Sequence, residues 1–269
     1  MKTLRTNAEM RAALAEAHRS GQSIGLVPTM GAFHDGHLSL MRAARAENAV
    51  AVVSLFVNPS QFGPNEDLGR YPRDEPRDTR TAEEAGIDFL FTPDAAEIYP
   101  DGFETWVDVQ ELGASLEGEV RPGHFRGVAT VCVKLFNIVR PDRAYFGQKD
   151  AQQAAVIRRM VRDLDLRLEI RVLPIVRDAD GLALSSRNVF LSPEQRQQAL
   201  ALPHALEAGR DAWRRGADPV AAACRVLEGL DVDYVSVADL DGPTLAAAVR
   251  IGQTRLIDNV RLEEEGSAS

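Results

Sequence analysis

The feature that most constrains the fold is residues 49–57, AVAVVSLFV, a nearly continuous run of apolar and β-branched residues. Such a run is typical of a strand buried on both faces, as in a parallel sheet with helices on each side. Shorter apolar runs alternate with helical patterns on either side of it, at 24–28, 87–93, 143–147 and 167–176. This alternation predicts an α/β fold with a doubly wound parallel sheet.

Helical patterns fill the intervals between these runs. They cover residues 8–20, 36–47, 75–86, 127–139 and 150–164, and Asn7 is expected to cap the first of them. The pattern changes after Val176, so we predict a domain boundary near 175–180, followed by a smaller α+β domain.

The predicted elements of the smaller domain are helices at 193–214 and 217–229 and short strands at 233–239 and 254–260. The Ala-rich segment PTLAAAV, residues 243–249, is expected to form a helix between the two strands. The tail, residues 263–269, is expected to be solvated and frayed.

Composition excludes several classes of protein. With a formal net charge of −9, the chain is a poor candidate for binding nucleic acid, which needs a basic face. No apolar run approaches the ~20 residues that span a bilayer, and the N-terminus has no apolar signal region. We therefore expect a cytoplasmic protein with no membrane partner. Cys132 and Cys224 are predicted to be buried free thiols in a reducing compartment.

The segment PTMGAFHDGH, residues 28–37, follows the first long strand pattern. In open parallel sheets ligands bind beyond the carboxyl ends of strands, and helix N-termini there offer unpaired N–H groups to phosphate. His34 and His37, two of only five histidines, are three residues apart and can point the same way. The alternative is that one caps the turn and the other packs in the core. Zinc is disfavoured, because neither His124 nor a cysteine completes a familiar ligand spacing.

Further polar segments follow other predicted strands. FGQKD, 146–150, places Lys149 at a strand-to-helix corner, where it is either a phosphate ligand or a solvated lysine. GLALSSRN, 181–188, is either a loop that closes over a triphosphate or an ordinary linker. The amides of Gln61 and Gln153 suit a substrate with hydroxyl and carboxylate groups, although either amide alone is more often structural.

These motifs resemble those of a known family. HDGH, 34–37, is similar to the HIGH signature, and SSRN, 185–188, to the KMSKS loop, of the nucleotidyltransferase superfamily shared with class I aminoacyl-tRNA synthetases. Within it the chain resembles the pantoate–β-alanine ligase (pantothenate synthetase) family. The matching segments are VPTMGAFHDGHLSL, SLFVNPSQFGPNEDLGRYPR, RPGHFRGVATVCVKLFNIVRPDRAYFGQKDAQQ and DGLALSSRN, in that family's order.

The resemblance implies a Rossmann-like nucleotide- and pantoate-binding domain at residues 1–176 and a C-terminal α+β lid domain at 177–269, in a homodimer. It also implies a two-step reaction. The carboxylate of (R)-pantoate attacks the α-phosphorus of ATP, which carries Mg²⁺, and releases pyrophosphate. The amine of β-alanine then attacks the pantoyl adenylate, giving pantothenate, a coenzyme A precursor, and AMP. No metal bound by the protein itself is expected.

The resemblance also implies roles for individual residues. His34, His37 and Lys149 are expected to be catalytic, with His37 as proton donor to the leaving group. Pantoate is expected to bind Gln61, Gln153, Pro28 and Met30, and β-alanine to bind Gln61. The expected ATP-binding residues are Met30, Gly31, Ala32, Phe33, His34, Asp35, Gly36, His37, Gly147, Gln148, Lys149, Asp150, Val176, Leu184, Ser185, Ser186 and Arg187.

Two alternatives stay open at this point. One is another nucleotidyltransferase of the superfamily, which adenylylates a phosphate ester and lacks the paired Gln positions. The other is a non-catalytic nucleotide-binding module on the same fold, since fold alone does not establish activity. An aminoacyl-tRNA synthetase is disfavoured by the acidic charge and by the lack of an obvious RNA-binding appendage.

Overall fold

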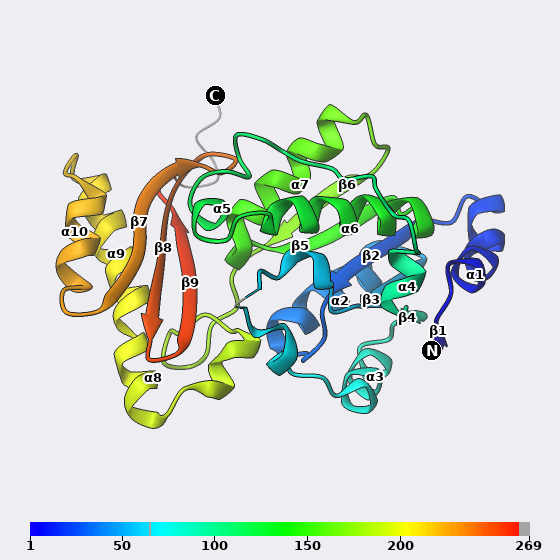
Figure 1. Cartoon of the computed structure of the whole chain (residues 1–269), viewed down its shortest axis with the longest axis horizontal. Coiled ribbons are helices and arrows are strands. Elements are labelled where there is room, and N and C mark those ends of the chain that lie inside the picture. Colours follow the sequence, from blue (N-terminus) through cyan, green and yellow to red (C-terminus); the bar gives the residue numbers. More distant parts are fainter. Residues whose placement is uncertain (65, 264–269) are drawn as a thin grey trace. The chain divides into compact units, whose positions relative to one another are not determined.

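The apolar runs form the strands of a six-stranded sheet in which every pairing is parallel. The structure is a computed structural model that describes residues 1–64 and 66–263 (Figure 1). The strand order is β1-β4-β3-β2-β5-β6. The strands are β1 (Lys2–Leu4), β2 (Ile24–Thr29), β3 (Val50–Leu55), β4 (Phe89–Phe91), β5 (Arg143–Gly147) and β6 (Glu169–Leu173). The predicted α/β fold with a doubly wound parallel sheet is confirmed.

Successive residues of the central strands are buried in two different cores. Leu26 and Phe146 belong to a core with α1, α6 and α7, whereas the adjacent residues Val27 and Tyr145 belong to a core with α2 and α3. Helices accordingly cover both faces of the sheet (Figure 1). The helices of this part are α1 (Asn7–Arg19), α2 (Asp35–Glu47), α3 (Glu75–Glu84), α4 (Ala95–Ile98), α5 (Glu117–Val120), α6 (His124–Val139) and α7 (Ala151–Asp163), with 3-10 turns η1 (Pro59–Gln61) and η2 (Asp67–Arg70).

The chain divides into two compact units. Among the described residues, the first contains Met1–Gly147 and Gln152–Leu173, and the second contains Gln148–Ala151 and residues 174–263. The division after Leu173 lies close to the boundary expected after Val176. The segment Gln148–Ala151, which includes the 3-10 turn η3 (Gln148–Asp150), groups with the second unit although its neighbours in sequence belong to the first.

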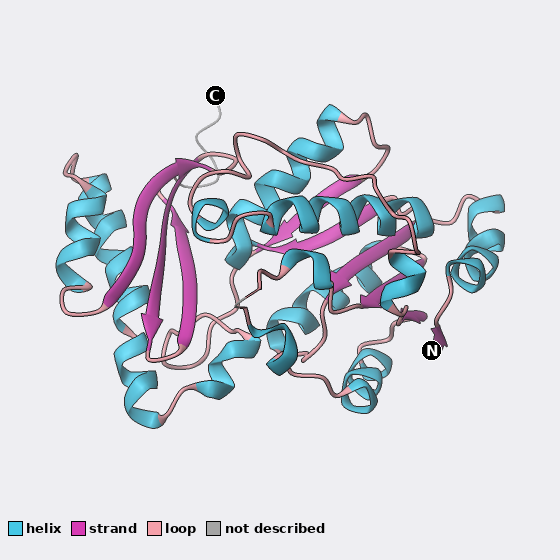
Figure 2. Cartoon of the chain, in the orientation of Figure 1, coloured by secondary structure: helices cyan, strands magenta, loops and turns pink. Residues whose placement is uncertain are grey.

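The second unit is built on a three-stranded antiparallel sheet of order β7-β8-β9 (Figure 2). Leu202, Leu245 and Val249 lie in its hydrophobic core. Its elements are η4 (Ser186–Phe190), α8 (Pro193–Ala199), α9 (Ala201–Arg214), α10 (Pro219–Val226), β7 (Asp231–Asp239), β8 (Pro243–Ile251) and β9 (Thr254–Arg261). Residues 264–269 of the tail lie outside the described residues.

Three predictions from local sequence are wrong. The segment 243–249 forms the central strand β8 instead of a helix, because β7 and β9 satisfy its backbone on both sides and its small side chains are buried. Thr6, not Asn7, caps α1, in a capping box with Glu9. Cys132 is buried as expected, but Cys224 is exposed. None of the helices in residues 1–64 and 66–263 has the length and apolarity needed to cross a bilayer.

Helix α6 lies against η1, the turn that contains Gln61, and a glycine permits this contact. A Cβ atom at Gly127 would lie 2.5 Å from the Ser60 carbonyl oxygen and 2.7 Å from the Gln61 nitrogen. Both neighbours are backbone atoms, which cannot rotate away as a side chain can. Gly127 therefore fixes how closely α6 approaches the turn.

We predict that Gly127→Ala lowers the free energy of unfolding by about 1–3 kcal/mol, because overpacking outweighs the ~1 kcal/mol gain in helix propensity. Urea denaturation measures this difference. The matched control is Asn137→Ala, an exposed site on the same helix, where the gain in helix propensity acts without a clash. Stabilisation by Gly127→Ala would contradict the contact.

Candidate active site

The candidate site begins at the centre of the sheet, where β2 and β5 are parallel neighbours. From β2 the chain continues through β3 to β4 on one side, whereas from β5 it continues to β6 on the other. The boundary between these two directions is the topological switch point, where open α/β sheets bind ligands beyond the strand ends. The segment Met30–His37 directly follows β2, and β5 ends at Gly147.

The turn after β2 requires an unusual backbone. Gly31 and Ala32 have φ values of +89° and +53°. A Cβ atom at Gly31 would lie 2.6 Å from Cδ1 of Leu55 and 2.8 Å from Oδ2 of Asp78. Only glycine combines this backbone conformation with so little space. The sequence therefore places Gly31 where the chain reverses direction before α2.

A buried carboxylate holds this turn. Asp78 on α3 is 1% exposed, and its oxygens accept hydrogen bonds from the N–H groups of Ala32 (2.8 Å) and Phe33 (2.9 Å). Burial raises the pKa of Asp78, and the two N–H donors partly oppose that shift. Sequence reasoning missed Asp78. The N–H groups that bind it, those of Ala32 and Phe33, precede α2.

The two histidines cap α2 reciprocally. His34 is the N-cap residue, and its Nδ1 accepts the N–H of Gly36 (3.2 Å), while Nδ1 of His37 accepts the N–H of His34 (3.4 Å). An Nδ1 atom that accepts a hydrogen bond carries no proton, so the proton of each neutral ring is on Nε2. The ring centroids are 4.2 Å apart. His34 therefore caps the turn, and its ring lies beside that of His37 with the proton of each neutral ring on Nε2.

Gln61, whose side-chain amide is predicted to bind the substrate, belongs to a buried polar cluster after β3. Its Oε1 accepts from Nδ2 of Asn58 (3.0 Å), and Oδ1 of Asn58 accepts from the hydroxyl of Tyr99 (2.9 Å). Asn58 is 1% exposed and Gln61 is 8% exposed. Within the described residues Nε2 of Gln61 has no hydrogen-bond partner, so it is available to a ligand. Asn58 was missed because its contacts to Tyr99 and to the carbonyl of Gly127, which place it in the cluster, join residues distant in sequence.

His124 fixes the backbone of the same turn. Its Nδ1 lies 2.9 Å from the carbonyl oxygen of Gln61, and because that oxygen can only accept, Nδ1 is the donor. Its Nε2 lies 3.2 Å from Arg121, a donor. Burial, together with the charge of Arg121, lowers the pKa of His124 to about 4. His124 is therefore neutral at physiological pH.

Arg121 is held in turn by Glu66. Its Nε donates to Oε1 of Glu66 (2.9 Å) and its second terminal nitrogen to Oε2 (2.5 Å). Burial opposes ionisation of Glu66, but hydrogen bonds and charge from Arg121 outweigh it, and the pKa of Glu66 lies below its ordinary value. A chain of polar contacts thus runs from Glu66 to the carbonyl of Gln61.

The other predicted amide, Gln153, lies on α7 and is half-buried. Its neighbour Gln152 is structural, since its Nε2 donates to the carbonyls of Leu112 and Ser115 (both 2.7 Å) and its Oε1 accepts the N–H of Glu117 (3.1 Å). Pro28 lies within β2 and Met30 directly after it. These residues belong to the first unit.

The remaining predicted ATP-binding residues, apart from Gly147, belong to the second unit. Nζ of Lys149 lies 3.6 Å from a carboxylate oxygen of Asp150, and the lysine side chain is 20% exposed. The N–H of Leu184 donates to the carbonyl of Val176 (3.0 Å), which closes a hairpin. The hydroxyl of Ser185 accepts the N–H of Arg187 (3.3 Å) and caps η4.

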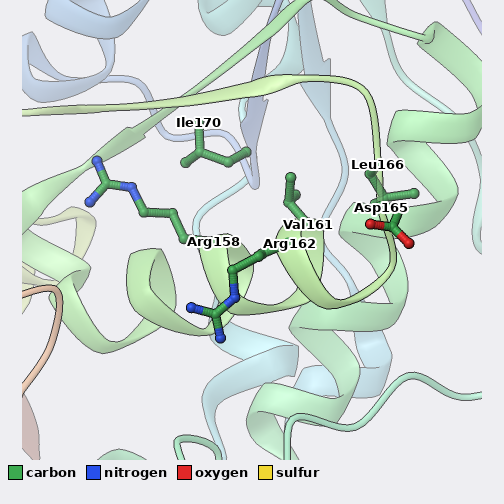
Figure 3. A pocket seen from close by; sticks show the side chains of 6 residues that line it. All are labelled: Arg158, Val161, Arg162, Asp165, Leu166 and Ile170. Carbon is green, nitrogen blue, oxygen red and sulfur yellow. The ribbon is translucent and has the colours of Figure 1, made fainter.

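A surface hollow of the first unit lies apart from the predicted site residues. This hollow, of about 440 Å³, lies beside α7 and β6 and contains none of the predicted site residues (Figure 3). Its lining residues are Arg158, Val161, Arg162, Asp165, Leu166 and Ile170.

Burial raises the pKa of Cys132 to about 12, so its thiol stays protonated at neutral pH. Among the described residues no three His, Cys, Asp or Glu side chains form a metal-binding cluster.

A sequence profile of the pantoate-beta-alanine ligase family matches residues 2–261. The chain belongs to this family. Pantothenate synthetase of Moorella thermoacetica is 54% identical over 280 residues, covering 98% of this chain and 99% of the relative. That of Roseiflexus castenholzii is 55% identical over 280 residues, covering 98% and 100%.

Solved structures of pantoate–β-alanine ligases have the same fold as this family member. Pantothenate synthetase of Thermus thermophilus is 47% identical with a TM-score of 0.93, covering 98% of this chain and 100% of that one. The enzyme of Francisella tularensis, complexed with β-γ ATP and β-alanine, is 34% identical with a TM-score of 0.86, covering 98% of each chain.

We predict that Asp78→Asn lowers the free energy of unfolding of this pantoate–β-alanine ligase by about 1–3 kcal/mol and lowers kcat. One amide oxygen replaces two carboxylate oxygens, so one turn N–H faces an NH₂ group instead of an acceptor. Urea denaturation and steady-state kinetics measure both effects. Asp74→Asn is the control, because Asp74 is the exposed N-cap of the same helix and Asn caps as well as Asp. Equal behaviour of the two variants would contradict the role of Asp78.

We predict that His124 makes folding stability depend on pH between about 4 and 6.5. Its folded-state pKa is lowered to about 4 from 6.5, so in this window the unfolded chain binds the proton that the folded chain excludes. Stability then falls as pH falls, with a slope approaching ~1.4 kcal/mol per pH unit.

His124→Asn keeps an N–H donor towards Gln61 but does not titrate, so its stability should decline less steeply in this window. Urea denaturation of both proteins from pH 4.5 to 7 provides the comparison. Identical slopes would show that His124 is not held neutral.

Proposed function

We propose that this chain catalyses the ATP-dependent condensation of (R)-pantoate with β-alanine to give pantothenate, AMP and pyrophosphate. The family match over residues 2–261 carries the proposal, because it includes both units and every predicted motif. In the first step the carboxylate of pantoate attacks the α-phosphorus of ATP and pyrophosphate leaves. In the second, the amine of β-alanine attacks the carbonyl of pantoyl adenylate and AMP leaves.

The first step needs no base, because the pantoate carboxylate is already ionised at neutral pH. It needs in-line placement and neutralisation of the charge that develops on pyrophosphate. In our proposal Met30–His37 hold ATP, His34 contacts its phosphates and His37 donates a proton to the leaving group. The reciprocal caps support these roles, since they leave the proton of each neutral ring on Nε2.

In our proposal the pantoate hydroxyls and carboxylate bind Gln61 and Gln153, and Pro28 and Met30 enclose its gem-dimethyl group. Because Asn58 occupies Oε1 of Gln61, the amide presents its Nε2–H donors, which suit a carboxylate. Gln61 also lies near the position of β-alanine in this scheme. His124 is a poor acceptor for the β-alanine proton, since its lone pair faces Arg121 and its pKa is about 4.

In our proposal further residues also bind ATP, and all of them except Gly147 belong to the second unit. Gly147–Asp150 contact the nucleotide, with Lys149 stabilising the transferred phosphoryl charge. Val176 contacts adenine through its backbone, and Leu184, Ser185, Ser186 and Arg187 bind the β- and γ-phosphates. Mg²⁺ arrives with ATP as its counter-ion. We further propose a cytoplasmic homodimer with no nucleic-acid or membrane partner.

The test is AMP release by the purified protein with ATP, Mg²⁺, pantoate and β-alanine, with each component omitted in turn. We expect strict dependence on all four components. Pyrophosphate exchange into ATP should require pantoate and should not occur with phosphopantetheine or nicotinamide mononucleotide as acceptor. Exchange with a phosphate ester instead of pantoate would overturn the proposal.

His37→Ala and Lys149→Ala should each reduce adenylate formation at least ~10²-fold while the protein stays folded, as expected for loss of an electrostatic group. His37→Ala also removes one acceptor of the α2 cap, so a small decrease in Tm is expected for that variant alone. His204→Ala and Lys2→Ala, both at exposed positions, are the matched controls and should keep full turnover. Near-normal turnover of Lys149→Ala would refute the role of that lysine.

A further inference from the structure

Asn259 is a buried amide on β9 that the proposed reaction does not use. It is 3% exposed and pairs with Ala246 of β8 in the antiparallel sheet. Its side chain leaves the sheet towards η3, the turn that contains Lys149, and β9 packs against this turn. The sequence had indicated only a strand at this point.

The side-chain amide of Asn259 binds the backbone of Gln148 and Lys149, the two residues that we call the Lys149 corner. Its Nδ2 donates to the carbonyl oxygens of Gln148 and Lys149, both at 2.9 Å. Its Oδ1 accepts from Nε2 of Gln148 at 3.2 Å. Both amide hydrogens are therefore used, and two consecutive peptide groups are held by one side chain.

The residue before it anchors the other predicted phosphate-binding segment. Asp258, 2% exposed, accepts from Arg177 at 2.6 Å and 3.1 Å. Arg177 pairs with Ala183 in the hairpin that leads into Ser185–Arg187. Adjacent residues of one strand thus hold both segments of the second unit that are proposed to bind ATP phosphates.

We propose that Asn259 is a positioning residue for Lys149. A lysine side chain is flexible, so the place that its ammonium reaches depends on how firmly its backbone is fixed. Asn259 fixes the carbonyl groups of Lys149 and of the residue before it, and so directs Nζ towards the transferred phosphoryl group. This inference rests on the proposed function, because it assumes that Lys149 acts on ATP.

The decisive variant is Asn259→Asp, which keeps the shape of the side chain but removes both donors. A carboxylate that faces two carbonyl oxygens repels them, so the backbone of Gln148 and Lys149 is no longer held in this position. We expect kcat for pantoate-dependent pyrophosphate exchange to fall about 10–100-fold at saturating ATP, the scale expected when a catalytic group is displaced by about 1 Å.

A double-mutant cycle separates positioning from general stability. If Asn259 acts through Lys149, Asn259→Asp combined with Lys149→Ala will be no slower than Lys149→Ala alone. If the two fold-reductions multiply, the inference is overturned. Asn259→Ala, which lacks the repulsive carboxylate, is carried through the same cycle in case Asn259→Asp does not fold, and the same two outcomes decide.

Thr244→Val is the matched control in the same sheet. Thr244 is fully buried and its hydroxyl donates to the carbonyl of Gly242 at 3.0 Å, a bond that does not involve Gln148 or Lys149. We expect Thr244→Val to destabilise the protein without lowering kcat. An equal loss of kcat in this variant would show that Asn259 acts only through stability.

The single variant Lys149→Ala separates failure of the proposed function from failure of the positioning role of Asn259. Near-normal exchange in Lys149→Ala refutes the proposed role of the lysine, and the positioning inference fails with it. Slow exchange in Lys149→Ala with multiplying effects in the cycle refutes only the role of Asn259.

Discussion

The burial of the parallel sheet on both faces is the constraint on which the rest of the first unit depends. Parallel neighbours cannot be joined by a tight turn, so each strand is followed by a crossover that carries a helix. These crossovers cover the sheet and bring the segments after the strands to one edge. The histidine turn after β2 and the amide turn after β3 therefore share that edge, although His37 and Gln61 are 24 positions apart.

Several polar side chains around the proposed site bind backbone groups of this protein. Asp78 accepts turn N–H groups, His124 donates to the carbonyl of Gln61, and Asn259 donates to the carbonyls before α7. Segments that leave regular structure carry unpaired backbone groups, and burying these without partners costs free energy. The same bonds also fix the conformation of the segments that carry the proposed site residues.

The strand and helix pattern of the first unit could be predicted from sequence because tertiary packing agrees with local preference there. The strand β8 could not, because Ala-rich sequence favours a helix and only its two partner strands make it extended. The histidine turn was visible because its parts are contiguous. Asp78 and Asn259 were not, because each acts on residues far from it in the chain, and nothing in one sequence shows such pairs.

The contact between Asn259 and the Lys149 carbonyl joins residues that are 110 positions apart. During synthesis on the ribosome, the chain passes Lys149 long before Asn259 has been translated. All six strands of the parallel sheet precede β9 in the chain, so they are synthesised before the residue that holds the Lys149 carbonyl. The bonds that fix this backbone can therefore form only after residue 259 has left the ribosome.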